Sequence, residues 1–312
     1  MDKQFKDFKF KHFKWHFGDR YDGWRVRNVD TVFQVIPFFL RTRIDAQNFY
    51  SDRIHINHLE QFVTDHKAEM PQLSIMHILI AALVRLFSQR PNLNRFVVWN
   101  KIFARNHFNL SIAVKRSLTD SGEETLIKPY FRLEDTLQDI VARINNEVEN
   151  NIKLGQKNGS DIVAKTLGLL PSFLLRTAVL TLFWLDKIGI MPRTIFRVSP
   201  WHSSVFLTNI GSIGVESIYH HLYEFGTCSM FLALGRKTSH NVTGKDGNIY
   251  KDKSLLLRFV LDERVCDGFY YASSMRALNK ILANPECLLK PPENIVYDEG
   301  VRRKKSKATA KI

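Results

Sequence analysis

Charged residues gather in a short turn between an apolar run and a helical pattern. The apolar run, residues 255–261, has the length of a strand, and apolar residues recur at helical spacing over residues 269–284. The turn between them contains Asp262, Glu263, Arg264, Asp267 and Gly268. A strand that ends in such a turn places side chains at the rim of a sheet, where functional sites often lie. A carboxylate there has the chemistry to move a proton.

A hydroxyl group ends a second strand pattern. Thr208 closes this run and is followed by Asn209 and Gly211, which form an Asn-x-Gly turn pattern. A hydroxyl before a Gly-rich turn is well placed to donate a hydrogen bond to an oxyanion. Thr is also common in strands, and Asn-x-Gly is a common turn, so a structural role fits the same residues.

Two adjacent histidines, His220 and His221, lie between this turn and a further strand pattern at residues 227–235. Histidine titrates near neutral pH and therefore suits proton transfer. If the pair lies in a strand, the two side chains face opposite ways, so at most one of them points at any given site. For that histidine a catalytic role and a structural hydrogen bond remain alternatives.

The turn at residues 262–268 resembles the D-H-R-x-x-D-G signature of the catalytic domain of 2-oxoacid dehydrogenase acyltransferases. Residues 265–269 also resemble the corresponding turn of chloramphenicol acetyltransferase, and residues 206–211 resemble the T-x-S-N-x-G strand of the family. The resemblance implies that Thr208 donates to the oxyanion of a tetrahedral intermediate. It further implies that the turns are shaped by Asp262, Arg264, Asp267, Gly268, Asn209 and Gly211.

One position departs from the family's pattern. Where the family has the histidine that acts as general base, this chain has Glu263. Histidine has a reference pKa of about 6.5 and glutamate one of about 4.3, so a glutamate acts as base at neutral pH only where burial raises its pKa. Three hypotheses follow. Glu263 is itself the base or orients His220 or His221; the fold binds an acyl carrier without transfer; or Glu263 pairs with Arg264 or another surface cation.

The resemblance also implies a fold and an assembly. The fold is a two-layer α/β sandwich of the chloramphenicol acetyltransferase type, with a mixed β-sheet and helices packed on one face. The assembly is a homotrimer with the active site between subunits, so that Glu263 and Thr208 act across an interface. A coenzyme A thioester is the expected co-substrate, and neither a permanently bound cofactor nor a metal is expected.

The predicted function is therefore that of an acyltransferase, which moves an acyl group between coenzyme A and an unidentified thiol or hydroxyl acceptor. The alternative is a catalytically inactive acyltransferase-like scaffold that binds an acyl carrier, a protein partner or a membrane surface.

The composition describes an ordinary soluble globular protein, with 45% apolar and 24% charged residues in a chain of 312. Its three cysteines, Cys228, Cys266 and Cys287, form no C-x-x-C pair, which argues against a disulfide framework or a zinc site. Cys228 and Cys266 are expected in the core. The first residues lack the apolar core of a secretory signal, and a cytoplasmic location is expected.

The net charge of +14 is concentrated at the two ends of the chain. Residues 1–28 carry eight Lys/Arg against four Asp/Glu, and residues 302–312 carry six Lys/Arg and no acid, which leaves +4 for the body. This distribution argues against a basic groove, so nucleic acid is not an expected partner. The predicted domains are a basic aromatic arm at 1–28, an acyltransferase-like domain at 29–298 and a basic tail at 299–312.

The remaining elements follow from periodicity and breakers. An extended segment is expected over 31–44, with Pro37 at an edge or bulge. Helices are expected over 56–65, 75–89 and 133–153, and strands over 96–104 and 108–114.

Residues 169–190 are the most apolar part of the chain. The stretch 169–185 has 17 residues and contains Arg176, whereas a spanning helix usually needs about 20 apolar residues. We expect a helix that packs on the core or on a neighbouring subunit, with peripheral membrane contact as the alternative.

Overall fold

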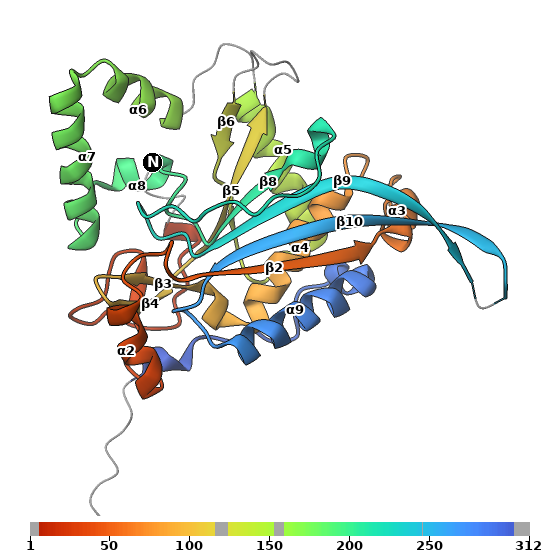
Figure 1. The fold of residues 1–312 in the computed structure, drawn as a ribbon, viewed down its shortest axis with the longest axis horizontal. Coiled ribbons are helices and arrows are strands. Elements are labelled where there is room, and N and C mark those ends of the chain that lie inside the picture. Colours follow the sequence, from red (N-terminus) through yellow and green to blue (C-terminus); the bar gives the residue numbers. More distant parts are fainter. Residues whose placement is uncertain (1–5, 116–123, 153–158, 245, 303–312) are drawn as a thin grey trace, which may run out of the picture.

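A mixed sheet of seven strands forms the centre of the protein (Figure 1). The computed structural model describes residues 6–115, 124–152, 159–244 and 246–302. The strand order is β2-β10-β9-β8-β5-β6, with β7 paired to β5. Strands β5, β8 and β9 run parallel, and the other pairs are antiparallel. The strands are β2 Gln47–His55, β5 Phe108–Lys115, β6 Glu124–Ile127, β7 Tyr130–Phe131, β8 Val205–Asn209, β9 Met230–Thr243 and β10 Ile249–Asp262.

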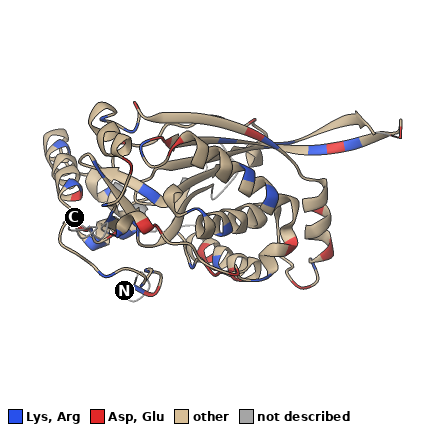
Figure 2. Cartoon of the chain, turned by 90° about the horizontal axis from the view of Figure 1, so that it is seen from below, with Lys and Arg blue, Asp and Glu red and all other residues tan. Residues whose placement is uncertain are grey.

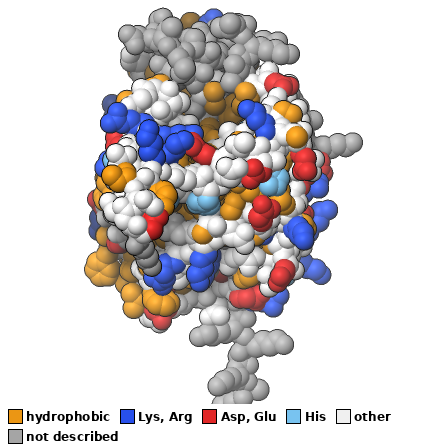
Figure 3. Space-filling model, turned by 90° about the vertical axis from the view of Figure 1, so that its right-hand side faces the viewer, with side chains coloured by type: hydrophobic (Ala, Val, Ile, Leu, Met, Phe, Trp, Pro, Cys, Tyr) orange, Lys and Arg blue, Asp and Glu red, His pale blue; other side chains and the backbone are white. Residues whose placement is uncertain are grey.

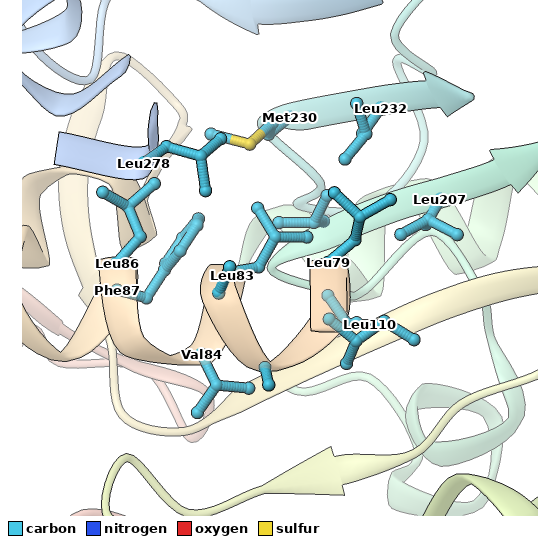
Figure 4. Close-up of a cluster of buried hydrophobic side chains, with 14 of the residues drawn as sticks. Leu79, Leu83, Val84, Leu86, Phe87, Leu110, Leu207, Met230, Leu232 and Leu278 are labelled. Atoms are coloured by element: carbon cyan, nitrogen blue, oxygen red, sulfur yellow. The ribbon is translucent and has the colours of Figure 1, made fainter. Parts of the chain in front are cut away.

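Four helices cover one face of this sheet: α3 Asn57–Asp65, α4 Ile75–Gln89, α5 Leu137–Ile152 and α9 Gly268–Ala283 (Figure 1). Helix α4 is buried on most of its surface because it lies between the sheet and its neighbouring helices. Figure 4 shows Leu79 and Leu83 of α4 among Leu207, Met230 and Leu232 of β8 and β9. This arrangement confirms the predicted two-layer α/β sandwich with a mixed sheet.

The opposite face of the sheet carries a smaller apolar cluster that includes Phe206, Phe231 and Val260. These side chains alternate with the core-facing residues of β8, β9 and β10, as expected for pleated strands. Three helices stand on this side of the protein: α6 Gly159–Gly168, α7 Ser172–Lys187 and α8 Arg193–Val198 (Figure 1).

The apolar stretch at 169–190 is helical from Ser172, because Pro171 occupies the N-cap position. The expected packing of this helix on the main core is wrong, since the main cluster contains no described residue of α7. Phe173, Leu180 and Trp184 on its outer side are exposed. None of the helices in the described ranges has both the length and the apolarity required to cross a bilayer.

The segment expected to be extended at 31–44 begins instead with helix α2, Thr31–Phe39. Its β-branched and aromatic residues favour a strand, but no neighbouring strand pairs with it. Asp30 supplies the N-cap, because its carboxylate accepts a hydrogen bond from Val32 N–H at 2.9 Å. The N-cap at Asp30 and the absence of a pairing strand together favour the helix.

The single strand expected at 96–104 is a hairpin. Strands β3 Arg95–Val98 and β4 Lys101–Arg105 are joined by Trp99 and Asn100, with φ of 50° and 57°. Turns with positive φ are usually marked in a sequence by glycine, because other residues seldom adopt it. This turn contains no glycine, and the hairpin was therefore not predicted. The helices expected at 56–65 and 75–89 and the strand at 108–114 are confirmed, while α5 begins four residues later than predicted.

Both ends of the chain contribute to the folded domain. Strand β1, Gly23–Arg25, pairs with β4, and Trp24 and Val26 lie in the main core. Val301 lies in the same core. Residues 23–28 and 299–301 are therefore part of the domain, although the sequence placed them in the arm and the tail. Figure 2 shows Lys and Arg interspersed with Asp and Glu along the described chain.

The β9–β10 hairpin extends well beyond the helical layer (Figure 1). At its turn, Gly244 N–H donates to the Asn248 carbonyl at 2.8 Å, while residue 245 lies outside the described part. Val242, Ile249 and Tyr250 near the tip are exposed. Figure 3 views this end of the molecule and shows side chains of both charges. Cross-strand pairs within the hairpin stabilise its outer half.

His107 makes the stability of the fold dependent on pH. Burial, and then the positive charges of Arg105 and Lys128, hold the pKa of His107 well below its usual value. The unfolded chain binds a proton at this histidine near pH 6.5, and the folded chain does not. The free energy of unfolding is therefore expected to fall as the pH is lowered below about 6.5, by up to about 1.4 kcal/mol per pH unit.

Urea unfolding between pH 7.5 and 5.5 measures this slope. The variant His107→Gln lacks the titrating group and should show a shallower slope than the original chain, whatever its absolute stability. Equal slopes in the two proteins would contradict the assignment.

Candidate active site

A buried ion pair holds the turn after β10. The Arg264 guanidinium donates to both carboxylate oxygens of Asp262, with Nε–Oδ1 of 2.7 Å and Nη2–Oδ2 of 2.6 Å. Both side chains are almost fully buried, and Arg264 Nη1 also donates to the Leu40 carbonyl at 3.0 Å. Removal of one partner from such a pair typically costs about 3–5 kcal/mol. The pair fixes the backbone on both sides of Glu263.

Glu263 is partly exposed at the end of β10, and its backbone N–H donates to the Ala46 carbonyl at 2.9 Å. The hypothesis that Glu263 pairs with Arg264 is wrong, because Arg264 binds Asp262. Among the described residues, no cation forms an ion pair with the Glu263 carboxylate. This carboxylate is therefore available to a substrate.

Asp267 ends the turn as the N-cap of α9. Its carboxylate accepts a hydrogen bond from Tyr270 N–H at 2.7 Å. Within the described chain, this backbone amide is the hydrogen-bond partner of the Asp267 carboxylate. Gly268 begins α9, and a Cβ added there would meet no atom within 4 Å. The space around this position therefore does not require a glycine.

The cysteines near the turn and the strands are buried. Burial raises the pKa of the Cys266 thiol to about 12, so it remains protonated at neutral pH. Cys228 lies in the second apolar cluster. Both cysteines lie in the interior, as predicted.

Thr208 lies near the end of β8, on the same face of the sheet as Phe206. Its neighbour Asn209 directs Nδ2 toward Met76 Sδ at 3.8 Å. Gly211 follows, and a Cβ at this position would lie 2.1 Å from the carbonyl oxygen of Gly235. Only a glycine permits this approach, which fixes the backbone directly after Thr208.

Thr208 faces an apolar cavity of about 780 Å³ between the sheet and helices α6 to α8. The sheet side of the cavity includes Phe206 and Phe231, and the helix side includes Leu182 and Phe183. Within the described part of the chain, the Thr208 hydroxyl has no hydrogen-bond partner. A hydrogen-bond donor therefore stands at the wall of an apolar site, as in many small-molecule sites.

His220 belongs to the same cavity, and His221 does not. The pair lies in a loop and not in a strand, and only one of the two histidines lines the cavity, in agreement with the expectation that at most one points at a given site. The His220 ring stacks on Phe231 with 4.2 Å between centroids and on His221 with 4.6 Å. Burial and the neighbouring His220 lower the pKa of His221. Neither histidine bonds to Glu263 among the described residues.

Glu263 and Thr208 of one chain are far apart. Thr208 pairs with Ala233 on β9, and Leu261 on β10 pairs with Met230. Glu263 is thus displaced by five positions along the strands, or roughly 16 Å at about 3.3 Å per residue. Strand β9 also lies between the two strands that carry them. A single chain therefore does not bring both side chains to one reacting carbon.

A buried network of polar side chains, not anticipated from the sequence, fixes the helix side of the cavity. Arg20 Nη2 donates to Asp186 Oδ1 at 2.7 Å, and His202 Nε2 lies 3.3 Å from Asp186 Oδ2. The Ser199 hydroxyl lies 2.7 Å from His202 Nδ1. Burial alone would raise the pKa of Asp186, but His202 and Arg20 lower it below the usual value. In the sequence, the only sign of this network was Asp186, a single acid directly after the apolar stretch 169–185.

The chain resembles known proteins in part of its sequence and in its fold. Residues 202–290 match the family model of the 2-oxoacid dehydrogenases acyltransferase (catalytic domain). No curated protein sequence matches the chain.

The solved structures that resemble the chain include a probable dihydrolipoamide acetyltransferase from Listeria monocytogenes, with a TM-score of 0.52, 14% identity and coverage of 86% of this chain and 97% of that one. They also include a truncated catalytic core of the 2-oxoacid dehydrogenase multienzyme complex from Thermoplasma acidophilum, with a TM-score of 0.50, 15% identity and coverage of 83% and 97%. A chloramphenicol acetyltransferase matches with a TM-score of 0.48, 8% identity and coverage of 78% and 92%.

The turn that carries Glu263 and the strand that carries Thr208 both lie within the matched residues 202–290. The likeness to the Listeria and Thermoplasma structures extends over most of the chain. The chain therefore has the fold of these acyltransferase structures and, in residues 202–290, the sequence pattern of the catalytic domain of 2-oxoacid dehydrogenase acyltransferases.

Proposed function

We propose that this protein is an acyltransferase that moves an acyl group between a coenzyme A thioester and a thiol or hydroxyl acceptor. The observation that carries the proposal is the Thr208 hydroxyl, which faces an apolar cavity and is unpartnered among the described residues. Transfer of an acyl group requires such a donor for the oxyanion, together with a site that excludes water.

The proposed reaction assigns a proton to Glu263. Its carboxylate takes the proton from the acceptor thiol or hydroxyl, and the acceptor attacks the thioester carbonyl carbon. Thr208 donates to the oxygen that becomes negative. The carbon–sulfur bond then breaks, the carbonyl re-forms on the acceptor, and Glu263 returns the proton to the sulfur of coenzyme A.

The proposal requires more than one subunit. The offset of roughly 16 Å along the strands separates Glu263 from Thr208 within a chain, so the two meet a common substrate only across an interface. We therefore propose a homotrimer in which Glu263 of one subunit faces Thr208 of the next. On this model a monomer is inactive.

A second candidate function is favoured by the identity of residue 263. A carboxylate stands where the resembled signature has its histidine, and no histidine is hydrogen-bonded to it in the described chain. A scaffold that binds an acyl carrier, a protein partner or, through residues 169–190, a membrane surface fits this substitution. Binding without turnover distinguishes it from the enzyme.

Calorimetric titration with coenzyme A and acetyl coenzyme A, alongside the mass of the protein in solution, tests the proposal without knowledge of the acceptor. We expect saturable binding to a trimer. Absence of binding to a trimer would overturn the enzyme proposal and favour the scaffold. A monomer that binds and turns over acetyl coenzyme A would overturn the shared site.

A further inference from the structure

The cavity beside Thr208 has the lining of a site for a hydrocarbon chain. Phe206 and Phe231 line its sheet side, and Val179, Leu182 and Phe183 of α7 line its helix side. Its volume of about 780 Å³ lies in the range of about 300–1,000 Å³ that small-molecule sites occupy. An acetyl group would leave most of this apolar volume unfilled.

The polar side chains that line the cavity differ in whether they have a hydrogen-bond partner. Ser199 lies 2.7 Å from His202 Nδ1, and Glu224 accepts a hydrogen bond from Arg43 N–H at 2.8 Å. Thr208 alone of these three has no hydrogen-bond partner among the described residues. A ligand with one polar group and a long apolar body fits this lining, with its polar group at Thr208.

The helix side of the cavity is anchored to the rest of the domain. Asp186 lies near the end of α7, and its carboxylate accepts a hydrogen bond from Arg20. Asp186 Oδ2 also lies 3.3 Å from Nε2 of His202, a residue that precedes β8. These groups are almost fully buried. The anchor holds the lining residues of α7 opposite the sheet, so the cavity is a built site with a defined wall.

We propose that this cavity binds the hydrocarbon chain of a medium- to long-chain acyl thioester, with the thioester carbonyl at Thr208. The inference rests on the proposed acyl transfer and names its substrate class. The chain extends from Thr208 past Phe206 and Phe231 toward α7. Each buried methylene is expected to strengthen binding up to about fourfold.

The test compares the affinities of acetyl, octanoyl and decanoyl coenzyme A by calorimetry, at concentrations below micelle formation. Octanoyl coenzyme A is expected to bind at least about 100-fold more tightly than acetyl coenzyme A, since it buries several additional methylenes. Equal affinities for the three esters would overturn the chain site and leave the proposed acyl transfer standing.

A matched pair of variants locates the chain. Leu182→Trp fills the cavity, whereas Leu180→Trp makes the same change at an exposed position of the same helix. Leu182→Trp is expected to reduce the preference for octanoyl over acetyl coenzyme A at least tenfold. Leu180→Trp should keep the preference. If Leu182→Trp fails to fold, Val179→Phe fills the same side of the cavity.

Free decanoate separates the two proposals. Binding of decanoate that Leu182→Trp weakens, with no binding of any coenzyme A ester, would support the chain site and overturn acyl transfer from coenzyme A. No binding of decanoate or of any ester would overturn both. A chain-length preference that Leu180→Trp abolishes and Leu182→Trp preserves would place the chain outside the cavity and overturn the inference.

Discussion

Replacement of Glu263 by glutamine is expected to lower kcat for acyl transfer by about 100-fold to 10,000-fold, the usual contribution of a general base. Glutamine has nearly the shape of glutamate, but its amide does not accept the proton of a thiol or hydroxyl. Neighbouring Asp262 and Arg264 keep their ion pair, so the turn should keep its conformation. Chromatographic separation of acetyl coenzyme A from coenzyme A, with a panel of thiols and alcohols as candidate acceptors, measures the rate.

Two further variants make this result interpretable. Glu263→His supplies a base with a reference pKa of about 6.5 and should retain turnover at neutral pH. Glu293→Gln makes the same chemical change at an exposed carboxylate outside the turn and should leave kcat unaltered. If Glu263→Gln and Glu263→His both turn over at the original rate, Glu263 is not the base.

Replacement of Thr208 by valine is expected to lower kcat by about 100-fold to 1,000-fold, as loss of one oxyanion donor does elsewhere. Valine matches threonine in shape and suits the apolar lining of the cavity, so the affinity for the coenzyme A ester should change little. The effect appears in kcat because the oxygen becomes negative only as the reaction proceeds. Single-turnover rates at saturating ester measure it directly.

Thr208→Ser is the matched control, because it keeps a hydroxyl on the same Cβ. It is expected to retain most of the activity that valine loses. Equal rates for the valine and serine variants would remove Thr208 from the oxyanion site.

The turn after β10 shows what the sequence could predict. Its position between a strand and a helix followed from the change from an apolar run to helical spacing, and the structure has β10 ending at Asp262 and α9 beginning at Gly268. The choice of partner was not predictable. Three acids, Asp262, Glu263 and Asp267, lie within three residues of Arg264, and Arg264 binds the fully buried Asp262.

Helix α2 shows why local propensity fails for some elements. Its Val, Ile and Phe residues are typical of strands, and Pro37 suggested an edge. A strand also requires a neighbour to pair with, and no strand of the described chain pairs with residues 31–39, although β2 at the edge of the sheet has only β10 as a partner. The cap at Asp30 then stabilises a helix in a segment whose composition alone favours the other state.

The cavity could not be derived from the sequence, because its two sides come from distant segments. Phe206 and Phe231 come from β8 and β9, while Leu182 and Phe183 come from a helix that the apolar pattern assigned to the core. The same limit applies to His220, whose place beside Phe231 depends on a loop without periodic structure. Periodicity predicts elements but not the contacts between them.

Because α6 to α8 lie outside the main core, the reacting groups of the site and the helix side of its cavity belong to different parts of the fold. Thr208 lies on β8 and Glu263 directly follows β10. The described part of α7 contributes nothing to the main core. Changes at the cavity-lining positions of α6 to α8, which do not include the buried anchor Asp186, can therefore enlarge, shrink or reshape the space opposite Thr208 while the strand register stays intact. Substrate range in proteins of this design is free to diversify through one contiguous segment, at little risk to folding.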